Sequence, residues 1–404
     1  IRLSELNVRN QNLIPAFNPD YTGNYSVYVP SGTEKVAIRA SSMKATNNVV
    51  VIGSLDDEDN ENDYRIIDLT GDQTNITIKV DNGNMFKEHT VVVYLNPTVT
   101  PLPIPEYPKP RSDLGTAVVD NKLYLIGGHN YFGSPYAGTV NYVEEFNPDD
   151  GTWEKKTDRP SPNWGFSMAS ASNGLIYLFG GTCLGLENSY QVFNPMGDNG
   201  DGSWVTIEDA MTTKRKGSVA VAKDEKIYIL GGVNDTGFLN SVEVFNTDTG
   251  DFTLLSTKMT FPRADFSAVL VGDLIYVFGG HNQLGYCSNI DIYDTVNDVW
   301  YLASNDFAEF KTLYKERSGC EAVLFNGRIY IIGGYNDNEY INTIEIFDPQ
   351  TETLTIANEV LAHPRAYFGA EVIDNKIHIY CGRNDSSIND GYVYQTEYID
   401  GGAQ

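Results

Sequence analysis

Arginine and carboxylate side chains recur at regular places along this chain and are its first candidates for chemistry. An arginine stands sixteen positions before five of six evenly spaced Gly-Gly or Cys-Gly pairs, and a tryptophan takes that place once: Arg111, Trp164, Arg215, Arg263, Arg317 and Arg365. An acid, or once a glutamine, follows each pair further along: Glu144, Gln191, Glu243, Asp291, Glu345 and Glu397. Five free guanidinium groups around one channel would bind an anionic ligand.

The segment that lacks the arginine also lacks the acid, and this favours a structural role for both. In an antiparallel sheet the two side chains would lie at one edge, about 10 Å apart across the intervening strand. Glycine between them leaves room for the two side chains to meet. We therefore predict five salt bridges within the repeats, with Arg263 less than about 6 Å from Asp291.

A variable residue two positions after the first member of each pair is the better candidate for binding. The set is His129, Thr182, Val233, His281, Tyr335 and Arg383, and an asparagine follows five of the six. Asparagine is typical of a turn that needs side-chain hydrogen bonds, whereas variation at a fixed exposed position indicates specificity.

Aromatic residues in the nearby loops extend this candidate face. Flat rings stack on sugars or anchor a partner protein, although they also pack loops onto each other. We expect a ligand-binding face that contains His129, Tyr131, Trp164, His281, Phe310, Tyr335 and Arg383.

The elements that must position these residues follow a repeat of about fifty residues. The first members of the pairs are Gly127, Gly180, Gly231, Gly279, Gly333 and Cys381, with spacings of 53, 51, 48, 54 and 48 residues. Each pair ends an apolar strand with Tyr or His in it, and an outer strand with Trp153, Trp204, Phe252, Trp300 or Leu354 follows in five repeats. Residues 111–399 resemble the kelch repeat, which implies a six-bladed β-propeller over residues 111–404.

Residues 1–96 have the period-two alternation of half-buried strands, as in Leu3-Ser4-Glu5-Leu6-Asn7-Val8 and Tyr25-Ser26-Val27-Tyr28-Val29. They resemble the bacterial cadherin-like β-sandwich, an accessory module of secreted or surface proteins. The predicted fold class is therefore all-β: a six-bladed kelch β-propeller preceded by an immunoglobulin/cadherin-like β-sandwich.

The proline-rich connector, residues 97–110, can form neither a helix nor a central strand. Only five residues follow Ile399, too few for a fourth strand of the sixth blade. We therefore expect residues from Pro97 to Leu102 to supply that outer strand and close the ring.

Composition excludes several classes of function. The formal net charge is −26, which disfavours nucleic acid and anionic lipid surfaces as partners. Four cysteines cannot form a dense disulfide framework, so we expect free thiols. No apolar run reaches the length of a membrane span.

Two sequence features could suggest a metal site, but neither meets the requirements of one. The acidic segment Asp56 to Asp63 has Asn62 where an EF-hand loop needs glycine, so we interpret it as a solvated hairpin tip. Galactose oxidase, which has the same kelch-like propeller architecture, holds copper with histidines and tyrosines. Here His129 and His281 would lie in opposite blades, too far apart to share one ion. We expect no cofactor and no metal.

These observations predict a non-catalytic extracellular or cell-surface recognition module of a bacterium, binding a glycan or a surface protein. The alternative is a sugar-processing enzyme similar to the six-bladed sialic-acid mutarotases, whose arginines and acids would suit a sugar carboxylate and acid–base assistance at its anomeric carbon.

Overall fold

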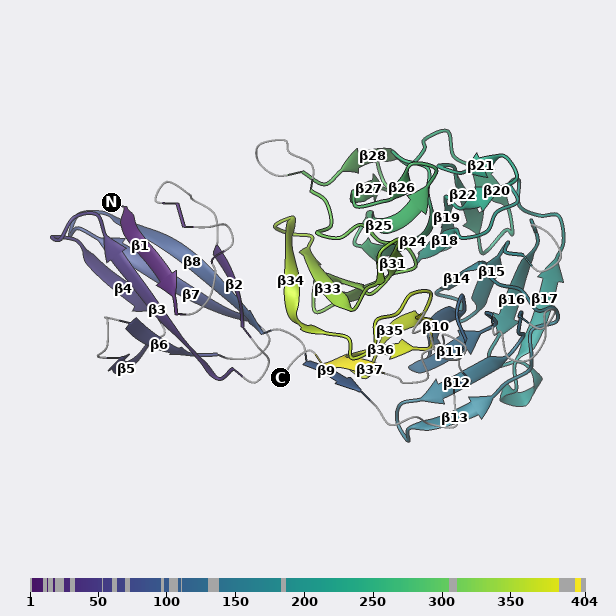
Figure 1. Cartoon of the computed structure of the whole chain (residues 1–404), viewed down its shortest axis with the longest axis horizontal. Helices are drawn as coiled ribbons and strands as arrows, with labels where there is room; N and C mark the ends of the chain where they lie inside the picture. The colour runs from purple at the N-terminus through teal and green to yellow at the C-terminus, as the bar shows by residue number, and fades with distance from the viewer. Residues whose placement is uncertain are drawn as a thin grey trace. The chain divides into compact units, whose positions relative to one another are not determined.

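The computed structural model describes residues 2–9, 13, 17–18, 25–29, 33–52, 54–59, 64–69, 73–95, 98–101, 108–109, 111–129, 138–182, 187–304, 311–384 and 397–400. Within these ranges the chain is all-β, apart from one three-residue 3-10 helix, η1 (Asp198–Gly200). None of the helical structure described is long and apolar enough to cross a membrane. The chain divides into two compact units, Val99–Ile399 and the remainder (Figure 1).

The first unit contains two four-stranded sheets among its described residues. One has the order β1 (Leu3–Val8), β3 (Lys35–Ser42), β6 (Tyr64–Asp68), β5 (Ser54–Asp59). The other has the order β2 (Tyr25–Val29), β8 (Phe86–Leu95), β7 (Gln73–Asp81), β4 (Asn48–Ile52), with β2 parallel to β8.

One hydrophobic cluster joins these two sheets. Leu6 and Ile38 come from the first sheet, while Val27, Ile78 and Val91 come from the second. The alternation seen in the sequence therefore turns one side of each strand toward a shared core.

The second unit carries the fifty-residue repeats, and each repeat builds most or all of a sheet whose main path has four strands. The first three sheets are β10 (Gly115–Val119), β11 (Lys122–Ile126), β12 (Val143–Asn147), β13 (Thr152–Lys155); then β14 (Ser167–Ser170), β15 (Ile176–Phe179), β16 (Tyr190–Asn194), β17 (Ser203–Ile207); then β18 (Val219–Lys223), β19 (Lys226–Leu230), β22 (Val242–Asn246), β23 (Phe252–Leu254).

The next three follow the same order. They are β24 (Ala264–Val271), β25 (Leu274–Asn282), β27 (Asp291–Asp294), β28 (Val299–Leu302); then β29 (Glu321–Phe325), β30 (Arg328–Ile332), β33 (Thr343–Asp348), β34 (Thr353–Val360); and finally β35 (Gly369–Ile373), β36 (Lys376–Tyr380), β37 (Glu397–Asp400), β9 (Thr98–Pro101). The segment expected to close the ring, Pro97 to Leu102, thus contains β9, the outer strand of this last sheet.

The first strands of the six sheets contact one another in sequence, β10 with β14, β14 with β18, β18 with β24, β24 with β29 and β29 with β35. Strand β35 in turn contacts β10, so the contacts return to the first sheet (Figure 1). The outer strands lie away from this centre, and their aromatic or apolar anchors pair with third-strand rings, as in Phe146 with Trp153 and Tyr293 with Trp300.

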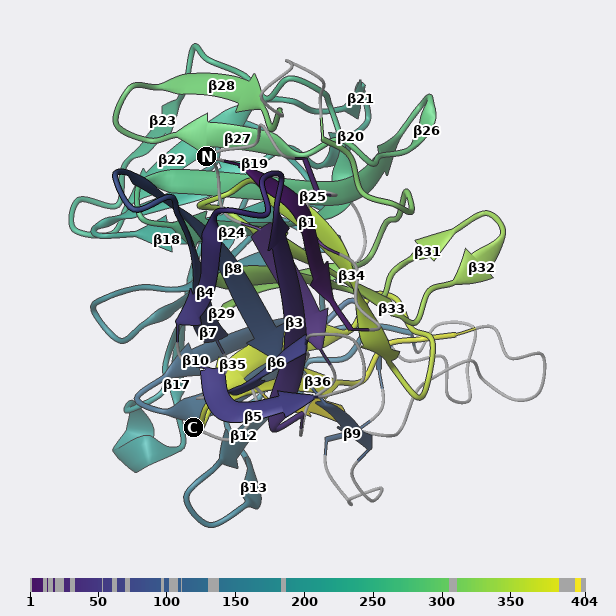
Figure 2. The ribbon, with the colours of Figure 1, turned by 90° about the vertical axis from the view of Figure 1, so that its left-hand side faces the viewer.

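Short hairpins extend one edge of this unit after the glycine pairs. They are formed by β20 (Val233–Asn234) with β21 (Gly237–Phe238), by the end of β25 with β26 (Gly285–Tyr286), and by β31 (Tyr335–Asn336) with β32 (Glu339–Tyr340). Figure 2 shows these hairpins projecting from the same side of the repeats. This edge carries those residues of the predicted ligand-binding face that the structure describes.

Candidate ligand-binding site

The arginine–acid pairs are buried salt bridges, which confirms the prediction for the four pairs whose side chains are described. Arg111 lies 2.6 Å from Glu144, Arg215 lies 2.6 Å from Glu243, and Arg263 lies 3.4 Å from Asp291. Arg317 pairs with Glu345. The fifth acid, Glu397, has a side chain outside the described residues.

Each of these side chains also satisfies the backbone around the glycine pair. Arg215 donates to the carbonyl oxygen of Gly231 at 2.7 Å, and Arg263 and Arg317 do the same to their own glycines at 2.9 Å. Glu243 accepts a hydrogen bond at 2.9 Å from the backbone N–H of Thr212, which lies in the segment between β17 and β18. The four arginines of these pairs have no exposed surface. They therefore stabilise the interior of the repeats and do not form a cationic channel.

The second repeat requires a correction of register. Counting sixteen positions placed Trp164 at the arginine position, but Asn163 occupies it and donates to the carbonyl oxygen of Gly180 at 3.1 Å. The glutamine of this repeat, Gln191, instead accepts a hydrogen bond from buried Arg159. Asn163 lies 17 positions before Gly180, so this stretch is one residue longer than the count assumed, and Trp164 takes the next position, on the candidate face.

The asparagines after the glycine pairs that the structure describes, Asn234, Asn282, Asn336 and Asn384, hold the turns by hydrogen bonds, as their recurrence indicated. The side-chain oxygen of Asn282 accepts the N–H of Leu284 at 2.8 Å, and its amide donates to the carbonyl oxygen of Pro262 at 3.0 Å. Asn384 makes the same bond to Pro364 at 3.0 Å. These bonds fix the hairpins and hold the preceding residue in place.

Six equivalent backbone positions, joined by five hydrogen bonds, surround the centre of the repeats at this edge. The six equivalent residues, two after each arginine position, all have a left-handed backbone: Asp113, Gly165, Gly217, Asp265, Gly319 and Tyr367, with φ between 52° and 66°. Five bonds of 2.7–2.9 Å connect them in order: Gly217 N–H to Gly165 O, Asp265 N–H to Gly217 O, Gly319 N–H to Asp265 O, Tyr367 N–H to Gly319 O and Asp113 N–H to Tyr367 O.

Three of these six positions carry side chains where glycine is the favoured residue. A left-handed backbone costs a bulky residue such as Tyr367 free energy that glycine does not lose. The neighbouring glycines also give these side chains room. A Cβ on Gly217 would lie 2.5 Å from the carboxylate of Asp265, and one on Gly319 would lie 3.1 Å from the ring of Tyr367.

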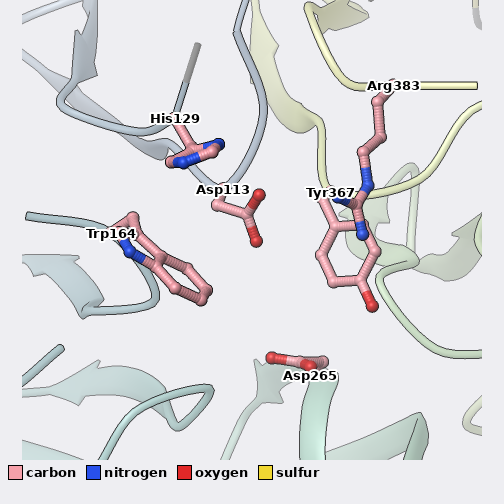
Figure 3. Close-up of a pocket in the computed structure, with 6 residues that line it drawn as sticks. All are labelled: Asp113, His129, Trp164, Asp265, Tyr367 and Arg383. Atoms are coloured by element: carbon pink, nitrogen blue, oxygen red, sulfur yellow. The ribbon is translucent and has the colours of Figure 1, made fainter. Parts of the chain in front are cut away.

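These three side chains line a pocket of about 130 Å³ at the centre of the ring, together with His129, Trp164 and Arg383. Figure 3 shows both carboxylates, the Trp164 ring and the hydroxyl end of Tyr367 bordering one common space. The guanidinium of Arg383 lies over the Tyr367 ring, 4.6 Å from its centroid. The Trp164 ring lies 5.8 Å from the His129 ring, and the ammonium group of Lys216 lies over it, 4.8 Å from its centroid.

Burial changes the acidity of the pocket. It raises the pKa of Asp265 to about 7, with a further contribution from the charge of Asp113, while Lys216 and Arg383 act in the opposite direction. Burial also raises the pKa of Asp113, against a 2.6 Å hydrogen bond from Ser112. The two acids therefore hold protons in a pH range in which exposed aspartates are ionised.

The histidines of this face are kept neutral by burial, which lowers the pKa of both His129 and His281. His281 lies beside the pocket, with Nδ1 3.6 Å from the Asp265 carboxylate and 3.1 Å from the Ser318 hydroxyl. Its position links the pocket to the hairpins of the fourth and fifth repeats.

The structure thus divides the predicted binding residues between two places. His129, Trp164 and Arg383 line the pocket. His281 and Tyr335 contact a row of rings on the hairpins, where Tyr335 lies 4.8 Å from Tyr340 and 6.0 Å from Tyr286. Tyr131 and Phe310 lie outside the described residues.

Asp113, Asp265 and Tyr367 were missed by the sequence analysis, although a signal was present. The position two residues after the arginine is glycine in three repeats and a larger residue in the other three. A position that is glycine in some repeats and a larger residue in others indicates a left-handed backbone. The larger side chains are then present although they lower the stability of the fold.

Further acids lie on the first strands of the fifth and sixth sheets, β29 and β35. Glu321 accepts a hydrogen bond from Ser267 at 3.1 Å, and Glu371 accepts one from Thr116 at 3.0 Å. Burial raises the pKa of Glu321 to about 8 and that of Glu371 to about 7. Cavities of about 100 and 200 Å³ contact Glu321, and one of about 350 Å³ contacts Glu371.

Within the ranges that the structure describes, no group of three or more His, Cys, Asp or Glu side chains is placed to hold a metal ion. Cys287, Cys320 and Cys381 are buried free thiols, as expected, while Cys183 lies outside the described residues. The Asp56 to Asp63 segment has no described side chains, so the hairpin-tip interpretation stays a prediction.

Comparison with known proteins places this architecture in a family. The family model of the KLHDC2/KLHL20/DRC7 Kelch-repeats domain matches residues 116–310 and 217–398. These matches together span most of the chain, so the protein belongs to the kelch-repeat family. Kelch repeats indicate a module that binds other proteins.

Individual relatives match shorter segments. The chain is 26% identical over 158 residues to Kelch repeat and BTB domain-containing protein 1 of Horsepox virus, covering 38% of this chain and 26% of the relative. It is 30% identical over 154 residues to N-acetylneuraminate epimerase 2 of Escherichia coli O6:H1, covering 38% of this chain and 40% of the relative. It is 26% identical over 143 residues to Alpha-scruin of Limulus polyphemus, covering 33% of this chain and 14% of the relative. The matched segments span less than half of each of these relatives.

Proposed function

We propose that the chain is a non-catalytic recognition module that binds a partner protein through the face containing the central pocket. In this proposal the six sheets are the blades of a six-bladed kelch β-propeller over residues 111–404, closed by the connector 97–110, and residues 1–96 are a cadherin-like β-sandwich. The ring of contacts between first strands supports the propeller. The core shared by two sheets supports the sandwich.

The observation that carries the proposal is the filling of three left-handed positions by Asp113, Asp265 and Tyr367. Glycine would fit these places without backbone strain, and the chain uses it at the other three. Side chains that cost stability and border an open pocket are typical of a functional site. Trp164 and Arg383 belong to the residue types that dominate binding energy in protein interfaces.

A two-variant experiment tests this face. The full chain would be screened against peptide and glycan arrays, including sialylated glycans, and hits would be measured again with Trp164→Ala and Arg383→Ala. Val296→Ala is the control, because Val296 is 68% exposed in the turn before β28, at the opposite edge of its sheet. Loss of a peptide hit in both site variants and its retention in the control supports the proposal. A glycan hit with the same pattern would replace the protein partner by a glycan, and unchanged binding in the site variants would move the site elsewhere.

We also propose an extracellular or cell-surface location in a bacterium. The support is the resemblance of residues 1–96 to the cadherin-like module. Protease accessibility of the tagged protein on intact source cells tests it: protection until lysis contradicts a surface location.

Sialic-acid mutarotation is the second candidate function, and the aspartate with a pKa near 7 is the observation that favours it. A group with this pKa can both accept and donate a proton at neutral pH, as assistance at an anomeric carbon requires. The similarity of one segment to a protein named N-acetylneuraminate epimerase 2 gives the substrate class. NMR of freshly dissolved N-acetylneuraminate would show faster anomer interconversion with the protein and none of that acceleration with Asp265→Asn.

A further inference from the structure

We propose that the partner presents a basic side chain, and that its cationic head enters the central pocket between Asp113 and Asp265. This inference rests on the proposed function and names the chemistry of the partner at the same site. It follows from the shape of the pocket, from its two acids and from its two aromatic walls.

The pocket has the size of a side-chain head group. Its volume is about 130 Å³, and an engineered protein cavity of about 150 Å³ binds a single benzene ring. A folded oligosaccharide or a whole peptide strand does not fit in this space, whereas one guanidinium or ammonium group with part of its stem does.

The walls suit such a group. The Trp164 and Tyr367 rings face the space with the two carboxylates between them (Figure 3). Aromatic faces attract cations and pack against the methylene stem of a long basic side chain. The carboxylates then accept the N–H donors of its head group.

Charge also favours a cation. With both acids ionised, the six lining residues carry two negative charges and the one positive charge of Arg383, a net charge of −1. Lys216, over the Trp164 ring, offsets part of this charge from outside the lining. The formal charge of −26 on the whole chain draws a basic partner toward it over a longer range.

The groups that face Asp265 set the pH dependence of this binding. They are Asp113, Lys216, Arg383, His281 and Tyr367. A bound cation favours the ionised carboxylate, so the protein releases a proton when the cation binds below the pKa of about 7. Affinity must then rise with pH, by about tenfold between pH 6 and pH 8 for one such proton.

Isothermal titration calorimetry with a matched pair of peptides tests the inference. The probes are acetyl-Gly-Gly-Arg-Gly-Gly-amide and the same peptide with citrulline, which has the shape of arginine without its charge. We expect the arginine peptide to bind at least about tenfold more tightly, and to release protons when titrated at pH 6.5 in two buffers of different ionisation enthalpy.

Three variants locate the effect. Asp265→Asn and Asp113→Asn each remove one charge while keeping a residue that tolerates a left-handed backbone. Each should weaken the arginine peptide by about tenfold, and Asp265→Asn should also flatten the pH dependence. Asp248→Asn removes the same charge from an exposed turn at the opposite edge and should leave affinity within about twofold.

Equal binding of the two peptides, affinity that falls as pH rises, unchanged affinity in both site variants, or no binding at about 10 mM peptide overturns the inference. These failures differ from failure of the proposed function. If Trp164→Ala abolishes binding of a partner from the arrays while the arginine peptide does not bind, the recognition face stands and the cationic partner does not.

Discussion

Replacing Asp265 should make the protein more stable, and the gain should depend on pH in a calculable way. Asp265→Asn removes the carboxylate charge and keeps a residue suited to a φ of 52°. Asp265→Gly removes the charge and also places the residue that the chain itself has at the equivalent Gly165, Gly217 and Gly319.

The magnitude follows from the pKa of the carboxyl group. Folding raises it from 3.8 to about 7, so the folded protein binds more protons than the unfolded chain between these values. Stability of the wild type therefore falls as pH rises through this range, by about 1.4 kcal/mol for each pH unit. Because the Asp265 side chain is 29% exposed, we expect the advantage of Asp265→Asn to grow by about 2 kcal/mol from pH 5 to pH 8.

The assay is urea unfolding followed by tryptophan fluorescence. All four tryptophans, Trp153, Trp164, Trp204 and Trp300, lie in the repeat unit, so the signal reports that unit alone. Asp265→Gly should show the same pH-dependent gain as Asp265→Asn, with up to about 1 kcal/mol more at both pH values from the relaxed backbone.

The stability gain of Asp265→Asn at pH 5, compared with its gain at pH 8, tests whether the pKa of Asp265 is raised in the folded protein. A gain for Asp265→Asn that is equal at pH 5 and pH 8 would show that the carboxyl group titrates normally in the folded protein. A loss of stability in both variants would refute the view that this side chain is retained at a cost.

Other expectations follow from the same contacts. Glu243→Gln should destabilise the repeat unit by about 3–5 kcal/mol in urea unfolding, because it leaves the buried guanidinium of Arg215 without a countercharge; a loss below about 1 kcal/mol would contradict the pairing. Glu321→Gln should raise the melting temperature more at pH 8 than at pH 5, since the carboxyl pKa of about 8 makes the wild type lose stability as pH rises from about 4.5; an equal rise at both pH values would argue against it. Deletion of residues 1–105 removes β9 and should lower the melting temperature of the repeats, whereas deletion of 1–94 should not; equal melting temperatures would reject closure by this strand.

Much of the fold was predictable from the sequence because the repeat is regular. The glycine pairs fixed the ends of the second strands, and the joint loss of arginine and acid in one repeat pointed to the salt bridges before any distance was known. The count of sixteen positions failed only in the second repeat, where the stretch before the glycine pair is one residue longer, so Asn163 and not Trp164 holds the arginine position.

The centre of the site was harder to predict. Asp113 and Asp265 are 152 positions apart in the sequence. They face one pocket because the first strands of the six sheets contact one another in order and the last contacts the first. Local pattern carries no information on that closure. The exposed ring residues were easier to find, since variation beside constant turn asparagines marks a surface that can change without loss of the fold.

The claim that the central pocket is the binding site is tested most directly by fluorine NMR of the protein labelled with 5-fluorotryptophan. The four tryptophans give separate probes, and Trp164→Phe assigns the one in the pocket. Upon addition of the arginine peptide, or of a partner found on the arrays, the account predicts that the Trp164 resonance shifts while those of Trp153, Trp204 and Trp300 stay in place. A bound ligand that leaves Trp164 unchanged and moves another tryptophan would contradict it.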